Sequence, residues 1–166
     1  SLVGSEMCIR DRHYAGITPV DTDAWPDIFS LQDLIDGNIL EKFPPLVVYG
    51  AFQDYDANYW KAGKVPSCEE YQIAVEKLIS KLDEDDSALL VILPPSEFTR
   101  ELPERGQTTE VFRSFNAVWE EVASQNDNVE LTHIGALAGD HEDPRHFDRT
   151  TLTALGEEVL KLSLIH

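Results

Sequence analysis

Apolar residues of this chain gather into three short runs that predict strands. Residues 46–50 form an apolar run that follows two prolines and ends at a glycine, as buried strands do. Residues 88–93 form a second apolar run, which two prolines close. Residues 129–134 alternate between apolar and polar in their first half, which favours a strand nearer a sheet edge.

Other apolar residues recur every three or four positions, which is the spacing of one helix face. A capping box, Ser67-Cys68-Glu69-Glu70, opens one of these stripes. Single helices between strands imply right-handed crossovers and a parallel sheet with helices on both faces. We therefore predict a three-layer α/β domain. The predicted helices cover residues 28–39, 71–82, 111–122 and 152–160.

The charge of the chain excludes some classes of partner. Its 166 residues include 13 Lys and Arg against 31 Asp and Glu, so the formal net charge is −18. Such a surface repels phosphate backbones and anionic lipid, and we expect no nucleic-acid partner. A bilayer span takes about 20 apolar residues, so no direct membrane insertion by this segment is expected. The acidic run at residues 83–86 predicts a solvated turn.

Both ends of the chain look foreign to the domain. Residues 1–12, SLVGSEMCIRDR, resemble the read-through translation of a sequencing adapter, and residues 162–166 resemble the start of another. The alternative for residues 1–12 is a natural N-terminal tail; a signal peptide would need a long apolar segment. We expect the domain to cover residues 13–161 as an internal piece of a longer chain, with Cys68 as its single cysteine.

Ligands of parallel α/β folds bind outside the carboxyl ends of the strands, which selects the loops at residues 50–64, 94–107 and 135–149. The third loop holds an Asp-x-x-His pair, Asp143 and His146, just before a predicted helix. There the carboxylate can hold the tautomer of the imidazole and leave its other nitrogen free as a general base. The pair is therefore our first candidate for chemistry.

Two other interpretations of this loop remain open. A solvated acidic loop needs no ligand at all. A zinc site of the His-Glu-x-x-His kind needs a helix, but here the second histidine comes one residue too late and Pro144 would break the helix. We expect no metal here, and no nucleotide cofactor, because the glycine-rich phosphate-binding motifs are absent from the sequence.

The Asp-x-x-His-Phe sequence at residues 143–147, with the helix after it, resembles the last block of the SGNH (GDSL-like) hydrolases. Residues 13–18 resemble the second block of that family, and residues 46–54 occupy the place of the third. Residues 115–119, Phe-Asn-Ala-Val-Trp, resemble the SGNH-like domains attached to bacterial membrane acyltransferases. The resemblance covers about residues 13–161 and depends on the order and spacing of these motifs.

The resemblance implies a flavodoxin-like SGNH hydrolase fold without its first strand, and an esterase or O-acyltransferase acting on acyl esters of small molecules or carbohydrates. It implies that Asp143 orients His146 and that the Gly16 N–H and the Gln53 side chain donate hydrogen bonds to the oxyanion. It also implies that the nucleophilic serine lies upstream of residue 13. Phe52 stands where the family has its oxyanion Asn, so this position offers no side-chain donor. No cofactor is implied. The bacterial cell envelope is the implied compartment.

Several alternatives stay open beside this hypothesis. Tyr55 and Trp60 can form an acceptor-binding wall, because sugars stack on aromatic faces, but core packing under the loop explains them equally well. Ser96, in the loop after the second predicted strand, is the alternative nucleophile. The alternative functions are a non-catalytic SGNH-like module that binds glycan and a flavodoxin-like partner-binding domain. A Gly-Asp-Ser sequence in the missing upstream segment would favour the enzyme.

Overall fold

The centre of the structure is a parallel three-stranded sheet. It contains β3 (Leu46–Gly50), β4 (Ala88–Leu93) and β5 (Val129–His133) in the order β3-β4-β5, and both neighbouring pairs are parallel. The predicted parallel α/β fold is therefore confirmed, with strand bounds within one residue of those expected. The structure is a computed structural model that describes residues 13–14, 28–29, 35–36, 42–51, 54–55, 57, 64–94, 101–140 and 147–165.

Three long helices follow three of the four predicted stripes: α2 (Cys68–Glu84), α3 (Thr109–Gln125) and α4 (Arg149–Ser163). Each begins where a side-chain oxygen accepts a backbone N–H from the first turn: Ser67 for α2, Thr108 for α3 and Asp148 for α4. Ser67 and Glu70 form the predicted capping box. These caps satisfy N–H groups that have no partner within the helix, so they set where each helix begins.

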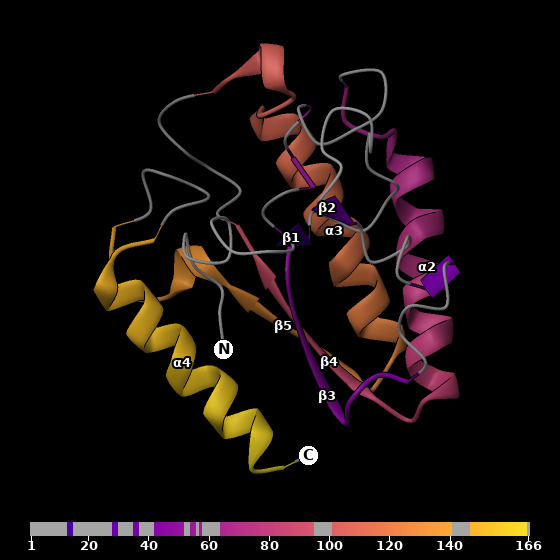
Figure 1. Cartoon of the computed structure of the whole chain (residues 1–166). Coiled ribbons are helices and arrows are strands. Elements are labelled where there is room, and N and C mark those ends of the chain that lie inside the picture. The colour runs from indigo at the N-terminus through magenta and orange to yellow at the C-terminus, as the bar shows by residue number, and fades with distance from the viewer. Residues whose placement is uncertain are drawn as a thin grey trace.

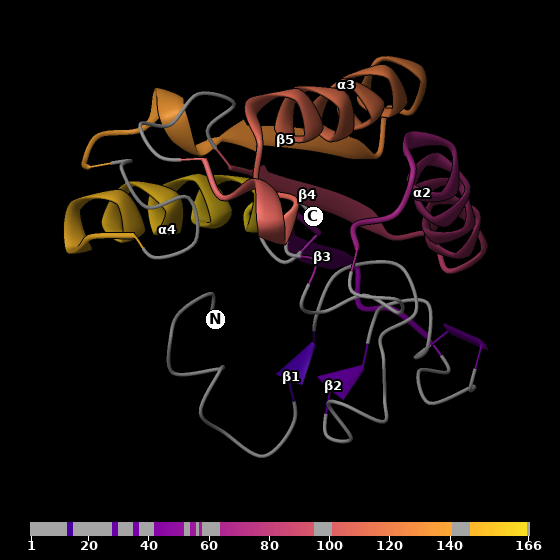
Figure 2. The same cartoon turned by 90° about the horizontal axis from the view of Figure 1, so that it is seen from above.

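The helices cover the two faces of the sheet. Leu89, Val91 and Leu93 point to one face, where they join the core built with α2 and α3. Ile92 points to the other face and packs with Leu155 of α4. This alternation follows from the period of two along a strand. Figures 1 and 2 show α2 and α3 on one side of the sheet and α4 on the other. All of β4 is buried, as a strand covered on both faces must be.

The N-terminal part of the chain corrects one prediction. Residues 28–29 form β2 (Ile28–Phe29), which pairs in parallel with β1 (His13–Tyr14), rather than the first turn of a helix over 28–39. The pair forms a separate small sheet, which lies apart from β3 in Figure 2. Of that predicted helix, the structure describes helical backbone at residues 35–36. Apolar spacing cannot distinguish a helix face from a short strand, and residues 28–29 form a strand.

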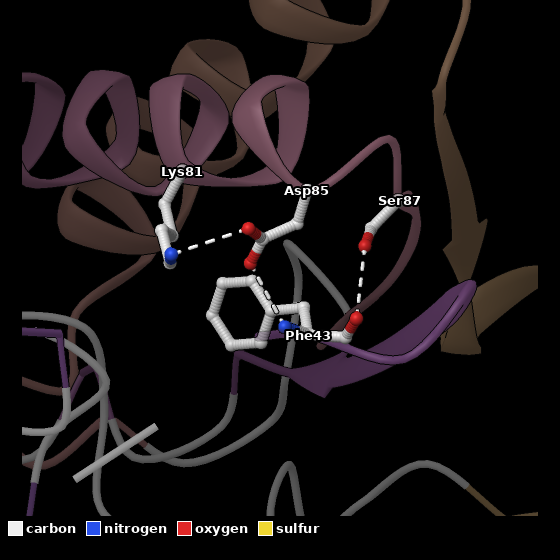
Figure 3. Close-up of polar contacts among 4 residues, drawn as sticks. All are labelled: Phe43, Lys81, Asp85 and Ser87. Carbon is white, nitrogen blue, oxygen red and sulfur yellow. Dashed lines mark hydrogen bonds and ion pairs between the residues drawn. The ribbon is translucent and has the colours of Figure 1, made fainter. Parts of the chain in front are cut away.

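The acidic run between α2 and β4 corrects part of a second prediction: Asp83, Glu84 and Asp86 are exposed as expected, but Asp85 is partly buried. Its carboxylate accepts the backbone N–H of Phe43 at 2.8 Å and pairs with the ammonium of Lys81 at 3.2 Å. The Ser87 hydroxyl donates to the Phe43 carbonyl at 3.4 Å. Figure 3 shows these contacts, which tie the segment before β3 to the turn before β4. The acidic run therefore contains a residue that joins two strands of the sheet.

Asp85 should make the protein less stable in acid. The hydrogen bond from the Phe43 N–H, followed by Lys81, holds the pKa of Asp85 below its ordinary value. A lowered folded-state pKa stabilises the fold above the unfolded pKa of about 3.9, and this stabilisation is lost as the pH falls through the folded pKa. Wild type should therefore be more stable than Asp85→Asn at neutral pH. The difference in stability between the two proteins should shrink as the pH falls.

Thermal unfolding followed by circular dichroism between neutral pH and about pH 3 checks this expectation. Asp127→Asn is the matched control, because Asp127 is exposed on the neighbouring turn. A gap between wild type and Asp85→Asn that is the same at every pH would contradict the assignment.

The C-terminal end of α4 differs in part from expectation. If residues 162–166 are foreign to the domain, they should pack poorly against it, and Leu164 and Ile165 are indeed 81% and 74% exposed. Leu162, however, lies within α4 and is only 8% exposed. The expectation is therefore wrong for Leu162, while the adapter origin of the two ends stays a prediction.

Candidate functional site

The carboxyl ends of the three strands lie side by side. In the sheet register, Gly50 of β3 lies beside Ile92 of β4, and Leu93 of β4 lies beside His133 of β5. Parallel neighbours are about 4.8 Å apart, so the loops that follow these strands emerge next to one another. In a sheet of this kind, that edge is where a ligand is expected to bind. The candidate site therefore lies at this edge.

A buried carboxylate, Asp54, lies just beyond β3. Its side chain is 0% exposed. One carboxylate oxygen accepts the hydroxyl of Tyr49 at 2.6 Å, and the other accepts the hydroxyl of Tyr71 at 2.5 Å. The Tyr71 oxygen in turn accepts the indole N–H of Trp119 at 2.7 Å. This network fastens the chain after β3 to α2 and α3, since buried polar groups are stable only when they are hydrogen-bonded.

Asn116 joins the two strand-end loops to α3. Its side-chain carbonyl accepts the hydroxyl of Tyr55 at 2.6 Å, and its amide donates to the carbonyl of Pro94 at 3.3 Å. Tyr55 belongs to the chain after β3, and Pro94 directly follows β4. The ring of Tyr55 is stacked on Phe112, with centroids 4.1 Å apart. One buried amide on α3 therefore sets the relative positions of both chain exits.

Burial also keeps three phenols of this region protonated. Desolvation raises the pKa of Tyr49, Tyr55 and Tyr71 well above the ordinary 10.0, and the negative charge of Asp54 raises each further. The three hydroxyls therefore act as hydrogen-bond donors at neutral pH. Their positions make them structural supports of the carboxyl edge.

The third loop leaves β5 through a short helix, η4 (Ile134–Ala136), and returns to the described residues at Phe147, before the N-cap of α4. The predicted Asp-x-x-His pair lies on the chain between these two points. Most of the predicted site residues lie outside the described residues: Gly16, Gln53, Trp60, Asp143 and His146, together with Phe52 and Ser96.

Tyr55 is the predicted site residue that the structure describes. It is 1% exposed, with its ring against Phe112 and its hydroxyl on Asn116. Both contacts belong to the core, so of the two interpretations offered for Tyr55, packing under the loop describes its surroundings. Its contribution to the site is to fix the backbone that follows Gln53.

Sequence reasoning did not assign roles to several residues that the structure places at this edge. Asp54 and Asn116 lay inside motifs quoted for the family resemblance, but nothing in their spacing shows that tyrosine hydroxyls converge on them. Gln107, in the loop after β4, is 3% exposed, and its side-chain N–H₂ group has no hydrogen-bond partner. Asp148 reads as an ordinary helix cap, although its carboxylate has a second partner in the chain.

Two features, a metal-binding group of side chains and a membrane-spanning helix, are absent from the described part of the chain. No group of three or more His, Cys, Asp or Glu side chains is arranged there to hold a metal ion. None of the helices described is both long enough and apolar enough to cross a membrane.

The fold and the edge thus define a parallel three-layer α/β domain with its candidate site after the strands. The chain is similar to the crystal structure of a putative acylhydrolase from Bacteroides fragilis NCTC 9343, with a TM-score of 0.56, 12% identity, and coverage of 96% of this chain and 92% of that chain. A GDSL-like lipase from Bacteroides thetaiotaomicron VPI-5482 is also similar, with a TM-score of 0.49, 12% identity and coverage of 95% of each chain.

At such low identity, the likeness to the acylhydrolase shows a shared fold. No protein-family model matches the sequence, and no curated protein matches it.

Proposed function

We propose that this chain is part of an SGNH-type esterase or O-acyltransferase domain that acts on acyl esters, including those of carbohydrates. The observation that carries the proposal is the fold it shares with an acylhydrolase over nearly the whole of both chains. A second support is the position in the sequence of Asp143 and His146, between β5 and α4. Loops after parallel strands are where such folds do their chemistry.

In the proposed reaction, a serine upstream of residue 13 attacks the acyl carbonyl. His146 takes the proton of that serine and gives it to the leaving alkoxide, while Asp143 orients the imidazole. The Gly16 N–H and the Gln53 amide donate hydrogen bonds to the oxyanion of the tetrahedral intermediate. Water or a second hydroxyl then takes the acyl group from the serine, and this choice separates an esterase from a transferase.

The proposed acceptor is a carbohydrate, and Trp60 is the proposed stacking surface for it. Tyr55 is not included in that surface, because its ring is covered by Phe112. The buried contacts of Asp54 and Tyr55 support the proposal indirectly, because they fix the backbone next to Gln53. The proposed compartment is the bacterial cell envelope, from the resemblance to acyltransferase-attached domains.

Ester hydrolysis tests the proposal in a chain extended upstream by a strand that ends in Gly-Asp-Ser, as the proposed reaction requires. With p-nitrophenyl acetate or an acetylated oligosaccharide, His146→Ala should lower the rate of the extended chain by about 10³-fold or more, since loss of the base removes most of the gain of a triad. Glu130→Ala is the matched control, because Glu130 is exposed on β5 away from the carboxyl end of that strand. Residues 1–166 alone should show no rate that depends on His146.

Two outcomes would overturn parts of this proposal. Turnover by residues 1–166 that depends on His146 would place the nucleophile inside this chain, and Ser96 would be the first residue to replace. No dependence on His146 in the extended chain would reject the enzyme.

A glycan-binding module without catalysis is the second candidate, and one observation favours it. Phe52 stands where the family has an oxyanion Asn, and loss of one such donor typically costs about 10²–10³ in rate. Such a module should bind an acetylated oligosaccharide through Trp60 with the same affinity in wild type and in His146→Ala. Isothermal titration of both proteins checks this.

A further inference from the structure

Helix α4 carries an apolar stripe on the side that faces away from the sheet. Leu155 and Leu162 lie on its inward side and are 4% and 8% exposed. Leu152 and Leu160 are 38% and 60% exposed. They stand four residues before and after Gly156, which is also exposed, so these three residues form one outer stripe. Helices α2 and α3 lie on the opposite face of the sheet, so neither covers this stripe (Figures 1 and 2).

The glycine in the middle of the outer stripe is not explained by its surroundings in one copy. A Cβ on Gly156 would meet no atom within 4 Å in the described part of the chain, and its backbone is helical. Glycine weakens the interior of a helix relative to alanine, because it has more conformational freedom to lose. What a glycine offers at an open position is room for another backbone to approach closely.

The side of α4 that is centred on Gly156 has no acidic side chain, although the net charge of the chain is −18. The charged residue on this side is Arg149, which is cationic and exposed. Of the two acidic residues of α4, Glu158 pairs with Lys161 at 3.5 Å. Glu157 is turned by about 100° from Gly156 around the helix axis. Like charges in close contact oppose association, so this side is where a second acidic molecule can approach α4.

We propose that the outer stripe is the contact of a symmetric dimer, in which α4 packs antiparallel against α4 of a second copy of this chain. A two-fold axis beside Gly156 places Leu152 of one copy against Leu160 of the other, because the two leucines are equally far from the glycine in opposite directions. The stripe is therefore complementary to itself.

The dimer should be reversible, because its contact is small. One helix of about 22 Å offers less area than the roughly 800 Å² per partner that a standard interface buries. We therefore expect a Kd on the order of 100 µM. High salt should tighten the dimer, because it screens the repulsion between two chains of charge −18.

Sedimentation velocity of residues 1–166 between about 10 µM and 1 mM measures this association. Wild type should change from monomer toward dimer over that range. Leu160→Glu should raise the Kd by about tenfold or more, because it places two carboxylates in the contact. Ile73→Glu is the matched control, since Ile73 on α2 is 59% exposed and the replacement adds the same charge. It should leave the Kd unchanged.

Gly156→Ala separates association from folding. Alanine is the better helix former, so at dilute concentration this variant should unfold at a higher temperature than wild type. Its Kd should nevertheless rise by about tenfold or more, because each added methyl group holds the two helices apart. A lower unfolding temperature with an unchanged Kd would show that Gly156 serves one copy only, and would contradict the proposal.

Three other results would overturn the dimer. The first is a chain that stays monomeric over the whole concentration range. The second is loss of the dimer when Leu164→Ser and Ile165→Ser are combined, which would assign the association to the exposed C-terminal end. The third is a dimer that forms with residues 1–166 but not with the chain extended upstream, which would show that another segment of the same chain covers the outer stripe.

Discussion

Replacing Tyr71 with phenylalanine should destabilise this protein by roughly 2–5 kcal/mol, because one hydroxyl serves two buried partners. It donates to the carboxylate of Asp54 and accepts the indole N–H of Trp119. Both partners are 0% exposed, so water cannot replace the lost contact. A buried polar group left without its partner costs about 1–3 kcal/mol, and more if it is charged. The stack of the ring on Phe115, at 4.0 Å between centroids, would remain.

Tyr55→Phe is the matched control for this effect. Its ring also stacks on a phenylalanine and is also buried, but within the described part of the chain its hydroxyl has one hydrogen-bond partner, Asn116. The expected loss is therefore about 1–2 kcal/mol. Urea denaturation of the three proteins measures both values, provided that the slope of the transition is unchanged. Equal losses for the two variants would show that the Asp54 network adds nothing beyond one hydrogen bond.

Alkali should unfold the protein through the same tyrosines. The pKa values of Tyr49, Tyr55 and Tyr71 are raised by burial first, and then by the charge of Asp54. A raised folded-state pKa leaves stability intact below the unfolded value of about 10 and removes it as the pH rises from there toward the folded value. In this range each buried tyrosine lowers the free energy of unfolding by about 1.4 kcal/mol per pH unit, so three together lower it by about 4 kcal/mol per unit.

Over two or three pH units this decrease equals the whole free energy of unfolding of a typical domain, which is about 5–15 kcal/mol. Tyrosinate absorbance and far-ultraviolet circular dichroism, followed together above neutral pH, measure the transition. At least three of the five tyrosines should ionise only as the helices unfold. Three phenols that ionise near pH 10 with the helices intact would show that they are not buried in solution.

The central elements of the fold are predictable because local signals and burial agree there. Residues 88–93 are apolar without a break, and a strand buried on both faces needs just that pattern. Ser67 and Glu70 mark the start of α2, because a capping box acts only between near neighbours in sequence. Residues 28–29 were misassigned, since a helix stripe and a two-residue strand can share the same apolar positions.

The location of the candidate edge is also predictable from the order of the elements. Helices between parallel strands bring the carboxyl ends of all three strands to one edge, and the motif loops follow those ends. The supports of that edge are a different matter. Asp85 reads as part of a solvated acidic run until Phe43, 42 residues earlier in the chain, is placed against it.

The sequence alone determines the three strands of the central sheet, three of the helices and the edge from which the motif loops emerge, because these depend on periodicity and on caps between near neighbours. The contacts of Asp54, Asn116 and Asp148 are settled only when the chain is folded. A carboxylate or an amide can pair with many partners, and the partners of Asp54 come from β3 and α2. The hydrogen-bond partners that these side chains have depend on how the helices pack on the sheet. The spacing of residues along the sequence does not show how the helices pack.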